Sequence, residues 1–206
     1  MDPVAFVVAG SPVTWTELLG DVTGLLCVYL VARANVWNWP VGLANVVLFF
    51  FTFLRARLYG DALLQVVFFV LNAYGWWLWT RPGERGAEPP VRRGTPLENA
   101  GLVGVSLAGT AGAALILARH TDSPVPLWDA SVLVLSIVAT WAQAEKLVES
   151  WWLWIAVDVI SVPLYMGRGL YATAVLYALF LGLCLMGLRE WLRLLEAQRA
   201  LAGAAQ

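Results

Sequence analysis

Four side chains able to bind a small molecule recur on one face of an apolar stretch, residues 150–165. They are Trp154, Asp158, Ser161 and Tyr165, at intervals of four, three and four. This spacing places side chains on one face of a helix. A carboxylate inside a bilayer costs roughly 2.5–3.5 kcal/mol on insertion scales, so it normally faces a bundle interior or a wet cavity. Asp158 is therefore the first candidate for a binding site.

The chemistry of these groups suggests a kind of ligand. The indole of Trp154 can stack on a flat ring and attract a cation, and Asp158 supplies a negative charge one turn away. Gln65, in another apolar stretch, offers the donor and acceptor that a carboxamide or a ribose hydroxyl needs. Together they predict a flat, cationic or polar heterocycle of about the size of a vitamin.

Two further polar stripes follow helical spacing. They comprise Asp61, Gln65, Phe68, Asn72 and Trp79 in one stretch, and Asn38, Asn45 and Thr52 in another. Such side chains either line a common cavity or only join helices, at about 0.6 kcal/mol per hydrogen bond in membranes. We favour a cavity for Gln65, Asn45, Trp154 and Asp158, with Asn72 as a further candidate.

The composition indicates a polytopic membrane protein. Of 206 residues, 60% are hydrophobic and 13% are charged, and the mean hydropathy is +0.72, which is too apolar for a soluble domain of this size. The net charge of −1 argues against a nucleic-acid partner. Cys27 and Cys184 lie within apolar runs and are expected to be buried thiols. The N-terminus lacks a basic region before an apolar core, so we expect no removable signal peptide.

About 20 apolar residues cross a roughly 30 Å hydrocarbon layer, and this length predicts seven spans. They are 15–32, 37–54, 61–80, 97–118, 127–143, 150–166 and 170–189. A loop rich in Pro, Gly and charge at 81–96 is the plausible hinge between two halves. Residues 192–206 are expected to form a frayed helix.

The distribution of Lys and Arg predicts the orientation in the membrane. The side of the N-terminus carries four, whereas the opposite side carries nine. Because basic residues are enriched in cytoplasmic loops, the N-terminus (1–14) is expected outside and the C-terminus (192–206) in the cytoplasm.

An internal repeat emerges at an offset of 112 residues. Seven residues of the third span recur in the seventh: Leu58, Tyr59, Ala62, Leu64, Phe68, Gly75 and Trp79 match Leu170, Tyr171, Ala174, Leu176, Phe180, Gly187 and Trp191. With one inserted residue the second and sixth spans also align, which sets Asn45 opposite Asp158. The sequence thus predicts two parallel three-helix repeats, 15–80 and 127–191, joined by a loop and linker helix at 81–126. In transporters of this kind the substrate site lies between the repeats.

Pro40 and Pro163 occupy the corresponding second and sixth spans. Each can kink its helix, so they mark either a gating hinge or a simple irregularity.

Two other classes of function remain open. A membrane enzyme is disfavoured because His120, the single histidine, lies in a connection and Asp158 has no midplane carboxylate partner. We therefore expect no catalytic residues, metal or cofactor, and no nucleotide loop of the G-x-x-x-x-G-K type is present for ATP hydrolysis. A non-transporting receptor or assembly subunit is the other alternative.

Several of these segments resemble the PnuC family of vitamin transporters. They are GLLCVYL in the first span, LYGDALLQVVFFVLNAYGWWLW in the third, PLWDASVLVLSIVAT in the fifth and ESWWLWIAVDVISVPLY in the sixth. The resemblance runs from about residue 15 to residue 191, except in the loop and the fourth span. It implies an all-α integral membrane fold of 3+1+3 helices, similar to the SWEET sugar transporters.

The resemblance also implies a function. Family members import nicotinamide riboside across the bacterial inner membrane by facilitated diffusion, with branches for riboflavin and thiamine. A cytoplasmic kinase phosphorylates and traps the vitamin without an implied contact to the transporter. A homo-oligomer is expected, with a trimer as the candidate state.

By the resemblance, Gln65, Trp154 and Asp158 match substrate-site positions, and Asn45 and Asn72 are weaker matches. Nicotinamide riboside importers have Asn at the position of Asp158, whereas actinobacterial riboflavin importers contain a segment similar to WIAVD. The third span, without an insertion, is closer to the nicotinamide riboside branch. Nicotinamide riboside is the favoured substrate, riboflavin and thiamine are alternatives, and Asp158 could instead carry a proton.

Overall fold

The computed structural model describes residues 4–8, 11–55, 57–81 and 90–204. In this part of the chain, seven helices are long and apolar enough to cross a membrane, which confirms the predicted number of spans. They are α1 (Trp15–Ala32), α2 (Asn38–Arg55), α3 (Tyr59–Thr80), α4 (Pro96–His120), α5 (Pro126–Ala144), α6 (Glu149–Gly167) and α7 (Tyr171–Ala204).

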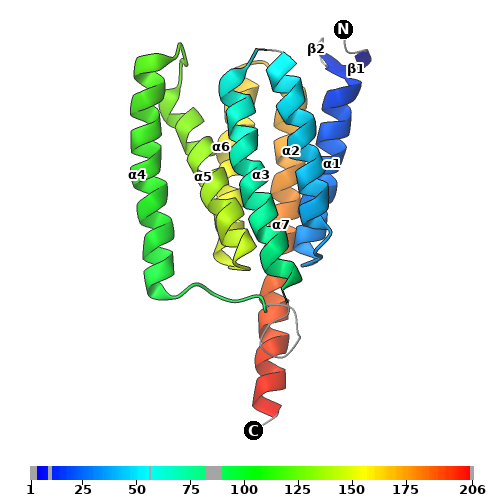
Figure 1. Ribbon diagram of the computed structural model, residues 1–206, viewed down its shortest axis with the longest axis vertical. Coiled ribbons are helices and arrows are strands. Elements are labelled where there is room, and N and C mark those ends of the chain that lie inside the picture. Colours follow the sequence, from blue (N-terminus) through cyan, green and yellow to red (C-terminus); the bar gives the residue numbers. More distant parts are fainter. Residues whose placement is uncertain (1–3, 9–10, 56, 82–89, 205–206) are drawn as a thin grey trace.

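The helix α7 differs most from expectation, because it continues without a break to Ala204, within the segment 192–206 that is expected to fray. Its 34 residues correspond to about 51 Å at 1.5 Å per residue, well beyond a hydrocarbon layer of about 30 Å. Leu195 of the extension is buried and packs against the core. The C-terminal part of α7 therefore projects from the end of the bundle (Figure 1).

Two helices begin at capping boxes. The Thr14 hydroxyl accepts a hydrogen bond from the Glu17 amide, and the Glu17 carboxylate accepts one from the Thr14 amide. Thr95 and Glu98 repeat this arrangement at α4, with Pro96 in the first turn. Because these contacts satisfy backbone N–H groups that have no intrahelical partner, they fix where α1 and α4 start.

A short hairpin precedes α1 and was not expected from the sequence. Its strands β1 (Val4–Val8) and β2 (Ser11–Thr14) pair antiparallel, with an irregularity between Val4 and Phe6. The hairpin lies at the end of the bundle opposite to the C-terminus (Figure 1).

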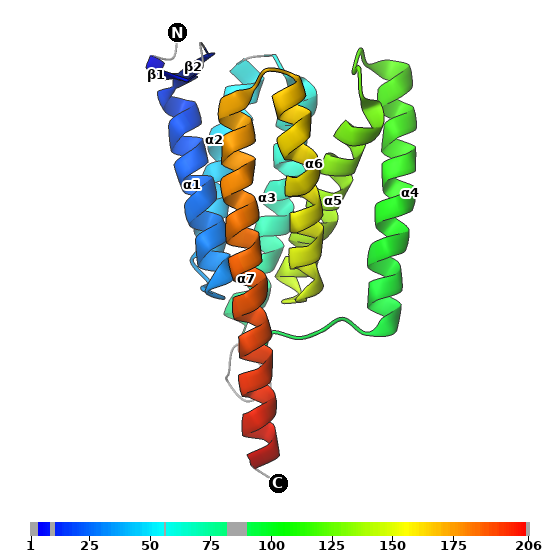
Figure 2. The same cartoon turned by 180° about the vertical axis from the view of Figure 1, so that it is seen from behind.

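Six of the helices surround the centre of the molecule, and α4 lies at one edge (Figures 1 and 2). Consecutive helices pack together from α1 to α3 and again from α5 to α7. The two groups meet where α1 packs on α7 and where α3 packs on α5, whereas α4 packs mainly on α5. The centre of the bundle is thus bounded by both groups.

The turns of the two groups share an unusual backbone geometry. Ala34 and Lys146, 112 residues apart, have positive φ angles of 50° and 52°, and Arg57 and Gly169, again 112 apart, have 61° and 74°. L-residues rarely adopt positive φ. The same conformation at matched positions therefore marks corresponding turns.

The hydrogen bonds at these turns also recur at a constant offset of 112. The bond from Asn35 N to Leu30 O matches the bond from Leu147 N to Ala142 O. The bond from Leu58 N to Phe53 O matches the bond from Leu170 N to Tyr165 O, and all four are 2.9 Å long. Because they flank α2 and α6 at both ends, no residue is inserted between these helices. The predicted alignment of Asn45 with Asp158 is therefore wrong by one position, and Asn45 corresponds to Val157.

Four buried tryptophans close the end of the bundle from which α7 projects. Trp39 meets Trp79 edge to face at 5.4 Å, Trp151 meets Trp191 at 5.5 Å, and Trp79 and Trp191 are 6.3 Å apart. Two indole N–H groups bond across the groups of helices, from Trp79 to Ala144 O at 2.9 Å and from Trp191 to Val31 O at 3.0 Å. We call these four residues the tryptophan cluster.

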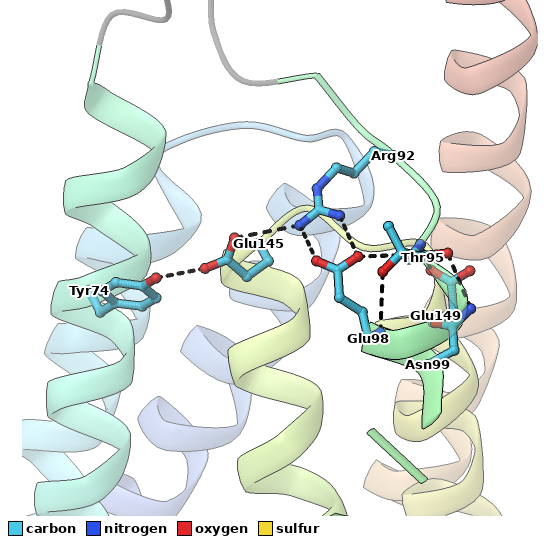
Figure 3. Close-up of polar contacts among 8 residues, drawn as sticks. Tyr74, Arg92, Thr95, Glu98, Asn99, Glu145 and Glu149 are labelled. Atoms are coloured by element: carbon cyan, nitrogen blue, oxygen red, sulfur yellow. Dashed lines mark hydrogen bonds and ion pairs between the residues drawn. The ribbon is translucent and has the colours of Figure 1, made fainter. Parts of the chain in front are cut away.

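The described residues of the loop before α4 form a polar network at the end of the bundle that holds the tryptophan cluster (Figure 3). Arg92 binds both Glu98 oxygens at 2.9 and 3.0 Å and lies 3.7 Å from Glu145, which accepts a 2.6 Å bond from the Tyr74 hydroxyl. The Glu98 hydrogen bonds raise the pKa of Arg92, so the guanidinium stays charged. Residues 82–89 of the predicted hinge loop lie outside the described residues.

Candidate functional site

A cavity of about 630 Å³ lies in the centre of the bundle. Its walls come from α1, α2, α3, α5, α6 and α7, and none of the described residues of α4 takes part. The lining extends from Val13 and Leu170, near the hairpin, to Val31 and to Trp151 of the tryptophan cluster. The size falls within the range of about 300–1,000 Å³ typical of small-molecule sites.

A second hollow of about 500 Å³ lies between α1 and α7. The described residues that line it are leucines, one tyrosine and one glycine. Because binding sites need a few convergent polar groups to orient a ligand, the central cavity is the better candidate.

The predicted face of α6 forms part of the cavity wall. Trp154, Asp158 and Tyr165 line it, in agreement with their helical spacing. Ser161 shares this face but is completely buried and does not reach the cavity. Tyr177 of α7 lies next to the Ser161 hydroxyl. The Tyr177 side chain, and not Ser161, lines the cavity at this place.

Trp154 is held by a neighbouring helix. Its indole nitrogen donates a 2.9 Å hydrogen bond to Oε1 of Gln143, in the last turn of α5. The ring is half-buried and Gln143 is nearly buried. An aromatic face is therefore presented to the cavity with its orientation fixed by a hydrogen bond.

Asp158 is 2% exposed, and its Oδ2 has no hydrogen-bond partner among the described residues. The Cys184 thiol lies beside the carboxylate. The ion pairs in the described part of the chain involve other carboxylates, from Asp129, Glu98, Glu145 and Glu190. The acid of α6 thus belongs to the wall of the cavity, and none of these ion pairs in the described part of the chain involves it.

The amide side chains of α2 and α3 also reach the cavity. Gln65, Asn45 and Asn72 all line it. Asn45 Nδ2 donates at 2.7 Å to Gly20 O and to the Thr23 hydroxyl. Asn72 Nδ2 donates at 2.8 Å to the backbone oxygen of its own helix four residues earlier. Gln65 has no such bond among the described residues, so its amide is the one most available to a ligand.

Other members of the polar stripes do not line the cavity. Asn38 is buried and bonds to Asn35 O, the Thr52 hydroxyl bonds to Leu48 O, and Asp61 is exposed. Trp79 belongs to the tryptophan cluster. These residues do not line the predicted common cavity. Helical spacing predicts which face of a helix points to a cavity, but not which turns along the helix reach it.

The two prolines are not among the lining residues. Pro163 is inside α6, where it removes a backbone hydrogen bond. Pro40 lies in the first turn of α2, where an N–H has no intrahelical partner in any case. The sequence-based argument for a kink therefore applies to Pro163 and not to Pro40.

Sequence reasoning missed several lining residues, most of the polar ones on α1, α5 and α7. Ser136, Thr140 and Gln143 of α5 advance by four and three, a stripe of the kind identified elsewhere. Glu17 and Asp21 of α1 and Tyr177, Phe180 and Cys184 of α7 also line the cavity. The α5 stripe could have been found from its spacing, whereas the aromatic residues of α7 look like ordinary membrane-facing side chains.

A comparison with protein families decides what the chain is. The family model described as Nicotinamide mononucleotide transporter matches residues 14–193. The chain belongs to this family.

Individual relatives are named as vitamin transporters. The nicotinamide riboside transporter PnuC of Escherichia coli is 32% identical, over 89% of this chain and 87% of the relative. The riboflavin/roseoflavin transporter RibM of Streptomyces davaonensis is also 32% identical, over 91% of this chain and 89% of the relative. These matches confirm the resemblance to the PnuC family and make the chain a transporter rather than an enzyme.

A solved structure supports the same family. The crystal structure of the vitamin B3 transporter PnuC aligns with a TM-score of 0.71 and 25% identity, covering 89% of this chain and 83% of that chain. The chain is thus a multi-pass membrane protein with the helical fold of a PnuC transporter.

Proposed function

We propose that this PnuC family member imports nicotinamide riboside through the central cavity. The supporting observation is the charge of the cavity wall: Glu17, Asp21 and Asp158 contribute carboxylates, and no Lys, Arg or His occurs among the described lining residues. A cleft lined by one sign of charge concentrates ligands of the opposite sign. Nicotinamide riboside carries its positive charge on a flat pyridinium ring.

The proposed binding mode follows from the three groups that the wall presents. The pyridinium stacks on Trp154, whose ring attracts cations, and the Asp158 carboxylate lies one turn away to balance the charge. Gln65 bonds to the carboxamide or the ribose, and Asn45, Asn72 and Tyr165 complete the wall. Ser161 supports α6 from behind and does not contact the ligand.

Two three-helix repeats, 15–80 and 127–191, alternate the exposure of this cavity in the proposed mechanism. The matched positive-φ turns and hydrogen bonds at an offset of 112 support corresponding units, as does the edge position of α4, which fits a linker helix within 81–126. This is the 3+1+3, SWEET-like arrangement. Pro163 is the proposed gating hinge, because it interrupts the hydrogen bonds inside α6.

Transport is proposed to run down the substrate gradient, with net uptake maintained when a cytoplasmic kinase phosphorylates the vitamin. No direct contact with the kinase is needed and no cofactor takes part. The alternative is uptake coupled to a proton carried by Asp158, as intramembrane acids do in some transporters. Flux into proteoliposomes with and without a pH gradient separates the two, since strict dependence on the gradient would rule out simple facilitation.

The proposed location is the bacterial inner membrane, with the N-terminus outside and the C-terminus in the cytoplasm. The excess of basic residues on the side of the C-terminus supports this orientation. We further propose a homo-oligomer in the bilayer, with a trimer as the expected state.

Riboflavin is the second candidate substrate, because the riboflavin/roseoflavin transporter RibM is as similar as the Escherichia coli PnuC. A neutral ring can accept or donate hydrogen bonds at the same wall but has no positive charge to pair with its carboxylates. Thiamine, a cation, is the third. Thermal unfolding of the purified chain with each vitamin tests the proposal, because a ligand raises stability only when it binds the folded state. Stabilisation by riboflavin alone would overturn it.

A further inference from the structure

The side chain of Gln143 is fixed in one orientation by its bond to Trp154. An indole N–H can only donate, so the atom that faces it at 2.9 Å must be the amide oxygen Oε1. The amide nitrogen Nε2 is thereby directed away from Trp154. It has no acceptor among the described residues, although Gln143 is only 9% exposed and lines the cavity.

The other polar residues of the α5 wall are satisfied by their own helix. The Ser136 hydroxyl donates to Val132 O and the Thr140 hydroxyl to Ser136 O, both at 2.7 Å. Gln143 is therefore the residue of this wall with N–H groups left for a ligand. An amide N–H that lines a cavity without a protein acceptor can donate to water or to a ligand there.

We propose that Gln143 is a positioning and specificity-determining residue, which fixes the plane of Trp154 through Oε1 and donates from Nε2 to a carbonyl oxygen on the ring stacked there. The inference rests on the proposed function and goes further, because it names the part of the ligand that is recognised. A flat ring held in one plane brings its substituents to a defined place on the wall. The carboxamide oxygen of nicotinamide riboside is an acceptor of the required kind.

A matched pair of ligands isolates this contact. Nicotinamide riboside and N-ribosylpyridinium share the charge, the aromatic ring and the ribose, but the second lacks the carboxamide. Equilibrium binding of both should show that the wild-type chain prefers nicotinamide riboside by about tenfold, because a site built to bond a polar group binds poorly the analogue that lacks it. Without any such preference the inference fails.

Two variants should reduce that preference to about twofold. Gln143→Met removes both functions of the amide, whereas Gln143→Glu keeps an acceptor for Trp154 and removes the donors. Because the charge added by Gln143→Glu attracts both cations, the ratio of their affinities is compared rather than either affinity alone. Ser131→Ala, on the same helix and outside the cavity, is the control and should leave the ratio unchanged.

The positioning role is tested in a Trp154→Phe background, which keeps an aromatic face but has no N–H. Gln143→Met should weaken N-ribosylpyridinium by about threefold in the wild type and have no further effect with Trp154→Phe. Additive losses would show that Gln143 does not act through Trp154. Failure of the wild type to bind nicotinamide riboside would refute the proposed function, whereas binding with an unchanged ratio in both variants refutes only the role of Gln143.

Discussion

Asp158 shows how one side chain can set the charge preference of a transporter. A buried carboxylate without a protein cation beside it is costly in the apo state, and a cationic ligand removes that cost. A neutral ligand can offer only a hydrogen bond. In the proposed binding site, Asp158 therefore favours pyridinium or thiazolium rings over a neutral flavin.

Asp158→Asn is predicted to weaken nicotinamide riboside relative to riboflavin. The amide keeps the shape and one acceptor but removes the charge, and a bond to a charged group exceeds a neutral one by roughly 1 kcal/mol or more. The affinity for the cation should therefore fall by about five- to tenfold, while that for riboflavin changes little. Isothermal titration of both ligands measures this, and an unchanged ratio would remove charge pairing from the mechanism.

Trp154→Ala is predicted to weaken any flat-ring ligand. Stacking of a base on an aromatic side chain contributes about 1–3 kcal/mol, so binding should fall by at least about fivefold. Val159→Ala, on the exposed side of the same helix, is the control for general damage to α6. Equal losses in the two variants would mean that Trp154 only packs.

The sequence predicted the groups of the site that follow from periodicity and polarity. Trp154 and Asp158 could be predicted because a charged residue stands out in an apolar helix, and residues at helical spacing from it lie on the same face. Gln143 was missed because it lies at the end of α5, where an amide looks like an interfacial residue. Its role depends on the contact between α5 and α6, which no single helix encodes.

At the scale of elements, two close approaches hold the helices of each group together. A side chain at Gly75 would overlap the ring of Trp39, and one at Gly187 would overlap the ring of Trp151. Each glycine thus allows a large indole to bury itself against the backbone of the adjacent helix. The pairs are again 112 residues apart, in α2 and α3 and in α6 and α7.

Gly187→Ala is predicted to destabilise the fold, since the added methyl group must displace Trp151 from the tryptophan cluster. Overpacking of this kind costs about 1–3 kcal/mol, and Gly75→Ala should behave in the same way. Gly182→Ala is the matched control on α7, because a Cβ there meets no atom within 4 Å and alanine favours helix by up to about 1 kcal/mol. Thermal unfolding in detergent compares the three, and equal midpoints for Gly187→Ala and Gly182→Ala would contradict the prediction.

Hydropathy located the membrane helices better than their ends. The predicted bounds of α1 agree with the structure because a capping box fixes its start. The segment 192–206 is expected to fray, yet its described part belongs to α7 and Leu195 packs on the core. The hairpin escaped prediction because it is short and precedes the first span, where only membrane crossing was assessed.

At the scale of the whole molecule, the cavity and the tryptophan cluster lie in series between the two ends. The cavity lining reaches the hairpin end, and the buried rings occupy the end from which α7 projects. The orientation of the chain in the membrane therefore decides from which side of the membrane a ligand would enter the cavity in this conformation. An excess of basic residues at the α7 end predicts that this end is cytoplasmic.

Labelling of single cysteines in intact cells tests this orientation. Thr121→Cys lies at the hairpin end, between α4 and α5, and Arg93→Cys lies at the α7 end; both positions are exposed. A membrane-impermeant maleimide should modify Thr121→Cys and should modify Arg93→Cys only after the cells are opened. The unsubstituted chain, with Cys27 and Cys184 in its helices, gives the background. Labelling of Arg93→Cys in intact cells, with Thr121→Cys protected, would indicate the opposite topology. The cavity in this state would then face the cytoplasm.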